Sequence, residues 1–187
     1  EDTSPANKFS ADVASTWVEM QLKLTKATAG YTPPVAARAY ALGGLTMYES
    51  VVSGLSNNQS LAGQLSALTT LPKTETGKDY NWAISANAAE ANMMRALYAE
   101  VSRPQAITNK RSIADAIFEW SKTDGGHEGY KRNFSATYIV PVFVGAWQTT
   151  ENGLKTPMQP TWGTNRTFVP ANQEMAIPNP ITFSNSL

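Results

Sequence analysis

Apolar side chains recur at helical spacing through the first two thirds of this 187-residue chain, and the spacing is lost after about residue 126. In the first such stretch Val13, Trp17, Met20 and Leu24 follow one another at steps of three or four residues. Steps of this size bring side chains to one face of a helix, whereas a strand would need alternation. The sequence therefore predicts an all-α domain.

The spacing predicts a helical bundle of about five helices. Thr32 stands where a side-chain oxygen can cap a helix, and Pro72 stands where a helix must end. Between them, Leu61, Leu65 and Leu68 form the apolar face of a short amphipathic helix. The five expected helices cover residues 11–28, 32–53, 57–71, 82–100 and a stretch from 108 or 112 to 122.

The second of these stretches, residues 32–53, is apolar on more than one side. Gly43 and Gly44 lie in its interior, where each glycine costs about 1 kcal/mol relative to alanine. A glycine in the interior of a helix usually has a packing reason, such as a close helix crossing. We therefore expect this helix to be central.

Residues 127–187 have a different composition. They hold six of the 11 prolines, few charged residues and many aromatic rings. Residues 138–145 are compatible with one helical turn or one strand, and residues 170–187 are expected to lie as an extended strap. We therefore divide the chain into a flexible N-terminal tail (1–10), a helical domain (11–126) and a long irregular, proline- and aromatic-rich packing segment of the same domain (127–187).

Charge and cysteine content exclude several classes of protein. Lysine and arginine together number 15, and so do aspartate and glutamate, so no attraction to nucleic acid is expected. No apolar run approaches the roughly 20 residues that a membrane-spanning helix needs. Because cysteine is absent, disulfides, thiolate catalysis and the common zinc-finger ligand sets are excluded.

Histidine occurs once, and this limits the catalytic sites that the chain can build. His127 follows two glycines and precedes Glu128, a position that suits a general base or an oxyanion ligand. The alternative is an exposed or capping loop histidine, which we prefer for a lone residue. We therefore assign no catalytic residue.

Acidic side chains pair along two predicted helices without completing a metal site. The pairs are Glu90 with Glu100 and Asp115 with Glu119. A di-iron bundle needs Glu-x-x-His pairs on two helices, which a single histidine cannot supply. We expect these carboxylates on solvated faces, and we assign no metal-binding or cofactor-binding residue.

Four tryptophans are candidates for ligand contact. Trp82, Trp120, Trp147 and Trp162 could form a flat platform for a carbohydrate or an aromatic ligand. In a helical domain such rings more often fill gaps at helix ends, and we prefer that interpretation. The alternative is a secreted helical binding module that holds a glycan or peptide through exposed tryptophans.

Seven segments, spread over nearly the whole chain, are similar to a known family. They are Trp17–Glu19, Thr28–Ala41, Met47–Val52, Asn87–Tyr98, Ile117–Gly126, Trp147–Thr150 and Gln159–Gly163. In these segments the chain resembles the N-terminal helical region of bacterial vanadium-dependent haloperoxidase-like (chloroperoxidase-like) proteins of the type-2 phosphatidic acid phosphatase superfamily. Residues 91–98 alone also resemble a helix of outer-membrane nutrient-binding lipoproteins.

The resemblance implies a vanadate or phosphate site that this chain does not carry. In the family, a lysine six residues before an Arg-Pro pair, a Pro-Ser-Gly-His segment and a Ser-Arg segment followed by histidine form that site. Here the residue seven positions before Arg103, with six residues between, is Ala96 and not lysine, and Ser121–Lys122 with His127 imitates the third segment only loosely. The family's order places the catalytic segments after Trp162–Gly163.

The resemblance therefore implies the N-terminal scaffold of a longer enzyme, without catalytic competence in this chain alone. Its expected partner is a C-terminal catalytic half or a partner subunit, and vanadate or phosphate is expected only there. A degenerate family member and a homo-oligomer both stay open, as does the choice between haloperoxidase and acid phosphatase. Residues 1–5 are typical of a trimmed tail, so we expect export to the periplasm or cell surface after signal peptide removal.

Overall fold

A computed structural model describes residues 5–99, 113–150 and 152–175. The α-helices are α1 (Asp12–Ala27), α2 (Pro33–Val51), α3 (Trp82–Leu97) and α4 (Ile113–Ser121). Short 3-10 helices are η1 (Ala6–Lys8), η2 (Val52–Gly54), η3 (Gly129–Lys131), η4 (Trp162–Thr164) and η5 (Pro170–Glu174). The described residues contain no β-strand, only one isolated antiparallel bridge between Phe134 and Met158. The all-α fold is thus confirmed.

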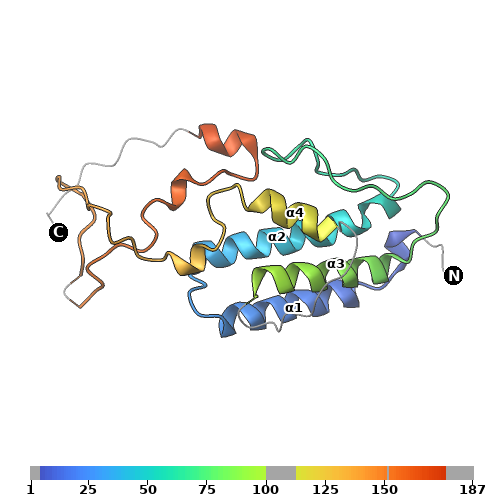
Figure 1. Cartoon of the computed structure of the whole chain (residues 1–187), viewed down its shortest axis with the longest axis horizontal. Coiled ribbons are helices and arrows are strands. Elements are labelled where there is room, and N and C mark those ends of the chain that lie inside the picture. The colour runs from blue at the N-terminus through green and yellow to red at the C-terminus, as the bar shows by residue number, and fades with distance from the viewer. Residues whose placement is uncertain (1–4, 100–112, 151, 176–187) are drawn as a thin grey trace, which may run out of the picture.

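The central helix of the bundle is α2, as its apolar surface predicts. It packs against α1, α3 and α4, and α3 also contacts α1 and α4. Figure 1 shows α1 and α3 lying side by side, with α2 and α4 paired next to them. Buried residues of α2 accordingly run from Val35 to Ser50.

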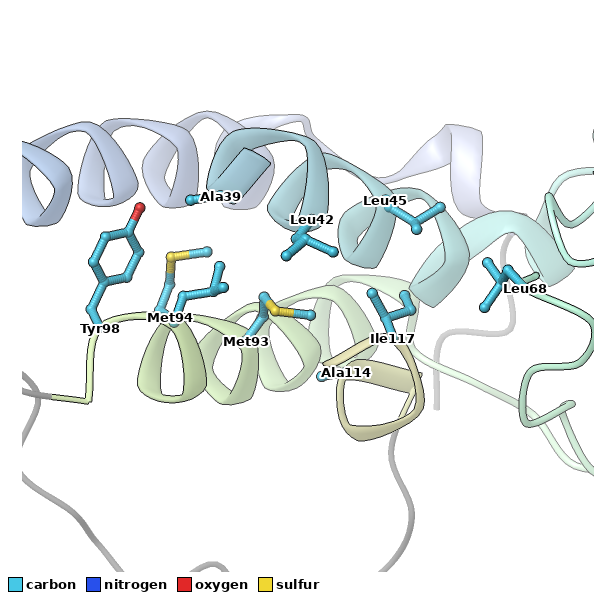
Figure 2. Close-up of a cluster of buried hydrophobic side chains, with 10 residues drawn as sticks. Ala39, Leu42, Leu45, Leu68, Met93, Met94, Tyr98, Ala114 and Ile117 are labelled. Atoms are coloured by element: carbon cyan, nitrogen blue, oxygen red, sulfur yellow. The ribbon is translucent and has the colours of Figure 1, made fainter. Parts of the chain in front are cut away.

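The hydrophobic core lies between α2, α3 and α4 (Figure 2). Leu42, Met93 and Ile117 come from these three helices in turn and are completely inaccessible to solvent. Fully burying a side chain of this kind stabilises the fold by about 1.5 to 3 kcal/mol. The other members of the core are Ala39, Leu45, Leu68, Met94, Leu97, Tyr98 and Ala114.

The helices begin and end close to the residues that the sequence predicts, and local features explain where α2 and α3 begin. Thr32 precedes α2 with extended backbone, and Pro33 begins the helix, where a proline loses no helical hydrogen bond. The Asn81 side chain caps α3 by accepting a hydrogen bond of 3.1 Å from the backbone N–H of Ile84. Helices α1 to α4 thus correspond to four of the five predicted helices.

The helix predicted over residues 57–71 is wrong, because this stretch is a series of turns. Gly63 and Ala67 have φ angles of +81° and +60°, a left-handed backbone that a right-handed helix cannot contain. The leucines at helical spacing still belong to the core or pack against it: Leu61, Leu65 and Leu68. The turns direct these leucines toward the core, which is the arrangement that one face of a helix would also produce.

Two expectations for the segment after residue 126 also need correction. Residues 138–145 form neither a helical turn nor a strand; they are irregular, and Val142 is 98% exposed. Pro141 lacks a backbone N–H, and none of the described residues forms a strand beside the run. Residues 170–174 form η5 instead of an extended strap, while the predicted strap from residue 176 onward lies outside the described residues.

Polar side chains attach this segment to the bundle at the start of α2. The Nε2 of Gln159 donates to Oδ1 of Asn133 at 2.8 Å, and the Thr32 hydroxyl donates to Oε1 of Gln159 at 2.9 Å. The Nδ2 of Asn133 also donates to the Gly30 carbonyl at 3.1 Å. We call Thr32, Asn133 and Gln159 the polar clip.

A second attachment involves the residues before η5. The Arg166 guanidinium lies 5.1 Å from the centre of the Trp120 ring and donates to the Trp120 carbonyl at 3.1 Å. The Phe168 ring packs edge-on against the same indole at 5.2 Å. The described residues between Asn133 and Gln159 reach away from the helices, as the orange trace in Figure 1 shows.

Candidate functional site

Two hollows on different faces of α2 bring polar and apolar side chains together. The first is a groove of about 440 Å³ between α1 and α2, which we call the α1–α2 groove. The second is a cavity of about 380 Å³ beside His127, which we call the His127 cavity. They differ in what their side chains can offer to a ligand or partner.

Apolar and aromatic side chains line most of the α1–α2 groove. Its residues are Trp17, Val18, Gln21 and Leu22 from α1, Tyr40, Gly43, Gly44, Met47, Tyr48 and Val51 from α2, and Glu90 from α3. Val18 and Leu22 are 57% and 51% exposed, which is high for side chains of their size. The groove therefore leaves an apolar helix face open to solvent.

The base of the groove carries a buried carboxyl group. Glu90 is 3% exposed, and its Oε1 has no hydrogen-bond partner in the described part of the chain. Burial raises the pKa of Glu90 to about 7, because the charged form loses its hydration. The other described residues that line the groove include no lysine or arginine. The carboxylate therefore lacks a counter-ion there.

A second buried glutamate, Glu49, has hydrogen-bond partners for both of its carboxylate oxygens. Glu49 of α2 is 4% exposed. Its Oε1 accepts a hydrogen bond of 2.6 Å from the backbone N–H of Leu61, and its Oε2 accepts one of 2.8 Å from the Ser60 hydroxyl. Glu49 thus fixes the turns after α2, a role that Glu90 does not share.

The adjacent glycines of α2 differ in their surroundings. A Cβ on Gly43 would lie 2.6 Å from Oε1 of Gln21, so this glycine is explained by the crossing of α1 and α2. A Cβ on Gly44 would meet nothing within 4 Å. The predicted close crossing accounts for Gly43, whereas Gly44 opens into the groove without a neighbour from the described residues.

The His127 cavity brings together the residues that follow α4 and the start of α2. Arg38, Lys122 and His127 line it, with Tyr31 and Tyr130 at its rim. Burial lowers the pKa of His127, and the nearby Glu128 carboxylate opposes that shift. The His127 and Phe118 rings pack edge to face, at 5.6 Å between ring centres.

The cations of this cavity already have anionic partners. The Nε of Arg38 lies 2.7 Å from Oδ2 of Asp124, with the two side chains 11% and 5% exposed. The Nζ of Lys122 lies 2.5 Å from Oε1 of Glu119. Both cations that line the cavity thus contact a carboxylate, and the Arg38–Asp124 pair is the more buried of the two.

The remaining sequence candidates are scattered. Asp115 and Glu119 lie on α4, while Glu100 and Arg103–Pro104 lie outside the described residues. No three histidine or acidic side chains in the described ranges are arranged to hold a metal ion.

The tryptophans occupy separate packing positions. Trp82 stacks on Tyr80 at 5.6 Å, and Trp120 packs on Phe168. Trp162 lies against Gly129, where an added Cβ would be 2.9 Å from its ring. These three rings are half-buried, whereas Trp147 is 49% exposed. The described contacts thus make the three rings part of the chain's own packing.

Sequence reasoning missed the burial of Glu90. The residue was assigned to a solvated face, yet it lies on the buried face of α3 with Ala86, Met93, Met94 and Leu97. Its spacing of three, four and seven residues from these apolar positions was a signal for burial.

The chain matches no family model, no curated protein and no solved structure. None of its described helices is both long enough and apolar enough to cross a membrane. Inference about function therefore rests on the sequence pattern and on the geometry of the two hollows.

Proposed function

We propose that this chain is the N-terminal helical scaffold of a vanadium haloperoxidase-like or acid-phosphatase-like protein. The observation that carries the proposal is the second apolar face of α2, which opens into the α1–α2 groove. A helix that is apolar all round is normally covered all round. In the proposed protein, helices of a catalytic half cover this face.

The His127 cavity supports a scaffold role for these residues. A site for vanadate or phosphate needs cations and hydrogen-bond donors that converge on the anion. Arg38 and Lys122 are instead paired with Asp124 and Glu119. Under the proposal the oxyanion is bound by residues of the catalytic half, and this chain shapes and supports that half.

The test compares this chain with the protein purified from its natural source. Intact mass is measured together with two activities: oxidation of bromide by hydrogen peroxide with added orthovanadate, and hydrolysis of p-nitrophenyl phosphate. We expect the 187-residue chain to lack both activities. The natural protein should be larger, or carry a second polypeptide, and should perform one of the two reactions.

Omitting orthovanadate and adding a chelator provide the controls for adventitious metal. A natural protein that has the mass of this chain, without a partner and without either activity, would contradict the proposal. Activity in the chain alone would contradict it too, because the catalytic groups would then have to lie within these residues.

A further inference from the structure

The shape of the α1–α2 groove fits an elongated occupant. Its α2 residues Tyr40, Gly44, Met47 and Val51 form a stripe at steps of three and four residues. Tyr40 and Val51 are 11 residues apart along the helix, a distance of about 16 Å or three turns. Hydrophobic grooves of this kind commonly bind an amphipathic helix, whose apolar side chains enter the groove at the same spacing.

Gly44 permits a closer approach than any other position on this stripe. It is exposed, and the space where a Cβ would stand is open. Glycine in the interior of a helix is less favourable than alanine, and no contact within the described chain explains its presence at position 44. A helix crossing at Gly44 would use the absence of the side chain, as Gln21 does at Gly43.

Glu90 specifies the chemistry of the occupant. A buried carboxylate without a partner is costly, and a cation that reaches it offsets the cost. The described residues that line the groove provide no such cation, whereas an occupant with a lysine or arginine would provide one. Trp17, Tyr40 and Tyr48 supply aromatic faces on which the stem and charge of a lysine or arginine can rest.

A second copy of this chain is a poor occupant for the same reason. In a two-fold symmetric contact the same face would meet itself. The described lining of the second copy's groove contains no lysine or arginine, so that face would bring no cation to Glu90.

We infer that the α1–α2 groove receives an apolar α-helix from another part of the assembly, and that this helix places one lysine or arginine at the Glu90 carboxylate. A small residue of that helix faces Gly44. The inference rests on the proposed function for the existence of a covering half, and adds the kind of helix that makes the contact.

The first test measures thermal unfolding of two variants, each in the 187-residue chain and in the natural protein. Gly44→Ala removes a flexible glycine from an open position, so Tm of the chain alone should rise by about 2 to 4 °C. Glu90→Gln removes a buried charge and should raise Tm of the chain alone at pH 8. In the natural protein both substitutions should lower Tm by several degrees.

A Tm that rises in the chain alone and falls in the natural protein cannot arise from misfolding, because both variants are expected to stabilise the chain itself. Gly163→Ala is the matched control: its Cβ would also meet nothing within 4 Å, but it lies outside the groove. It should change Tm equally in both samples. Shifts of the same sign for Gly44→Ala and Glu90→Gln in both samples would overturn the inference.

The second test places a photo-cross-linking amino acid at Met47 in the natural protein and sequences the linked peptide. An apolar peptide with helical spacing and one lysine or arginine is the expected product. A peptide without a basic residue, a peptide from a second copy of this chain, or no cross-link would overturn the inference. If the expected peptide is found but both activities are absent, the docking inference stands and the proposed function fails.

Discussion

The helical bundle and the segment after residue 126 are held together by different forces. In the bundle, Leu42, Met93 and Ile117 are completely buried. In the later segment, Ile139 and Val144 are 87% and 89% exposed, and the polar clip provides much of the attachment. Burial is non-directional and tolerant of small shifts, whereas hydrogen bonds require fixed partners. The two regions should therefore respond differently to substitution.

The largest difference should appear when one apolar side chain is truncated in each region. Leu42→Ala leaves a cavity between three helices and should lower the free energy of unfolding by about 4 kcal/mol, within the range for buried leucines. Val142→Ala, at a side chain that is 98% exposed, should change it by less than about 0.5 kcal/mol. Urea denaturation measures both, and equal losses would show that the later segment has a core of its own.

The next effect concerns the pH dependence of the bundle. The pKa of Glu90 in the folded chain is about 7, above its ordinary value of 4.5, so the folded state binds the proton more tightly than the unfolded state. The stabilisation is complete below pH 4.5 and is lost as pH rises through 7, a change on the order of 3 kcal/mol.

Urea denaturation of the chain and of Glu90→Gln at several pH values from 4.5 to 8 checks this prediction. The two stability profiles should diverge in slope, because the variant lacks the titrating group. Glu49→Gln is the matched control: its amide oxygen can accept only one of the two hydrogen bonds from Ser60 and Leu61, so the variant should be destabilised while the slope that Glu90 produces remains. Parallel stability profiles for Glu90→Gln and the unchanged chain would show that Glu90 does not cause the pH dependence.

A smaller effect is expected at the ion pair within the bundle that joins α2 to the turn after α4. Arg38→Met keeps most of the apolar stem but removes the partner of Asp124 and the 2.8 Å hydrogen bond to the Ser121 carbonyl. Loss of hydrogen bonds to a charged group should cost about 2 to 3 kcal/mol. A variant within 0.5 kcal/mol of the unchanged chain in thermal unfolding would show that solvent replaces the contact.

The smallest effect should come from the polar clip. Gln159→Ala removes the hydrogen bonds that Gln159 makes with Thr32 and Asn133 and should cost about 1 to 2 kcal/mol. Hydrogen exchange should increase at residues 129–133 and remain unchanged in α3. Uniformly faster exchange would instead mean that the clip supports the whole bundle.

The sequence predicted the helices well because their signals are local. The spacing of apolar residues and the prolines in the first turn of α2 need no knowledge of distant contacts. The predicted side-chain cap at Thr32 is wrong, because its hydroxyl bonds to Gln159 instead. The helix predicted over residues 57–71 is wrong because the leucine spacing indicates only which side chains face the core. It does not determine the conformation of the backbone between them. The left-handed Ala67 has no sequence signal of its own.

The candidate site was less predictable than the fold. The significance of Glu90 depends on partners that are absent around it, and a single sequence does not list the neighbours of a side chain. Gly43 and Gly44 are identical in the sequence, and only the packing of Gln21 separates their roles. The polar clip joins residues that no local pattern connects.

That clip has a consequence for the order of folding. The hydrogen bond between Thr32 and Gln159 spans 127 residues of chain, whereas the contacts within each helix span a few. Closing a longer loop costs more chain entropy, and contacts of long range form more slowly. The bundle should therefore assemble first and serve as the template on which the later segment settles, so that its ordering is the last step of folding.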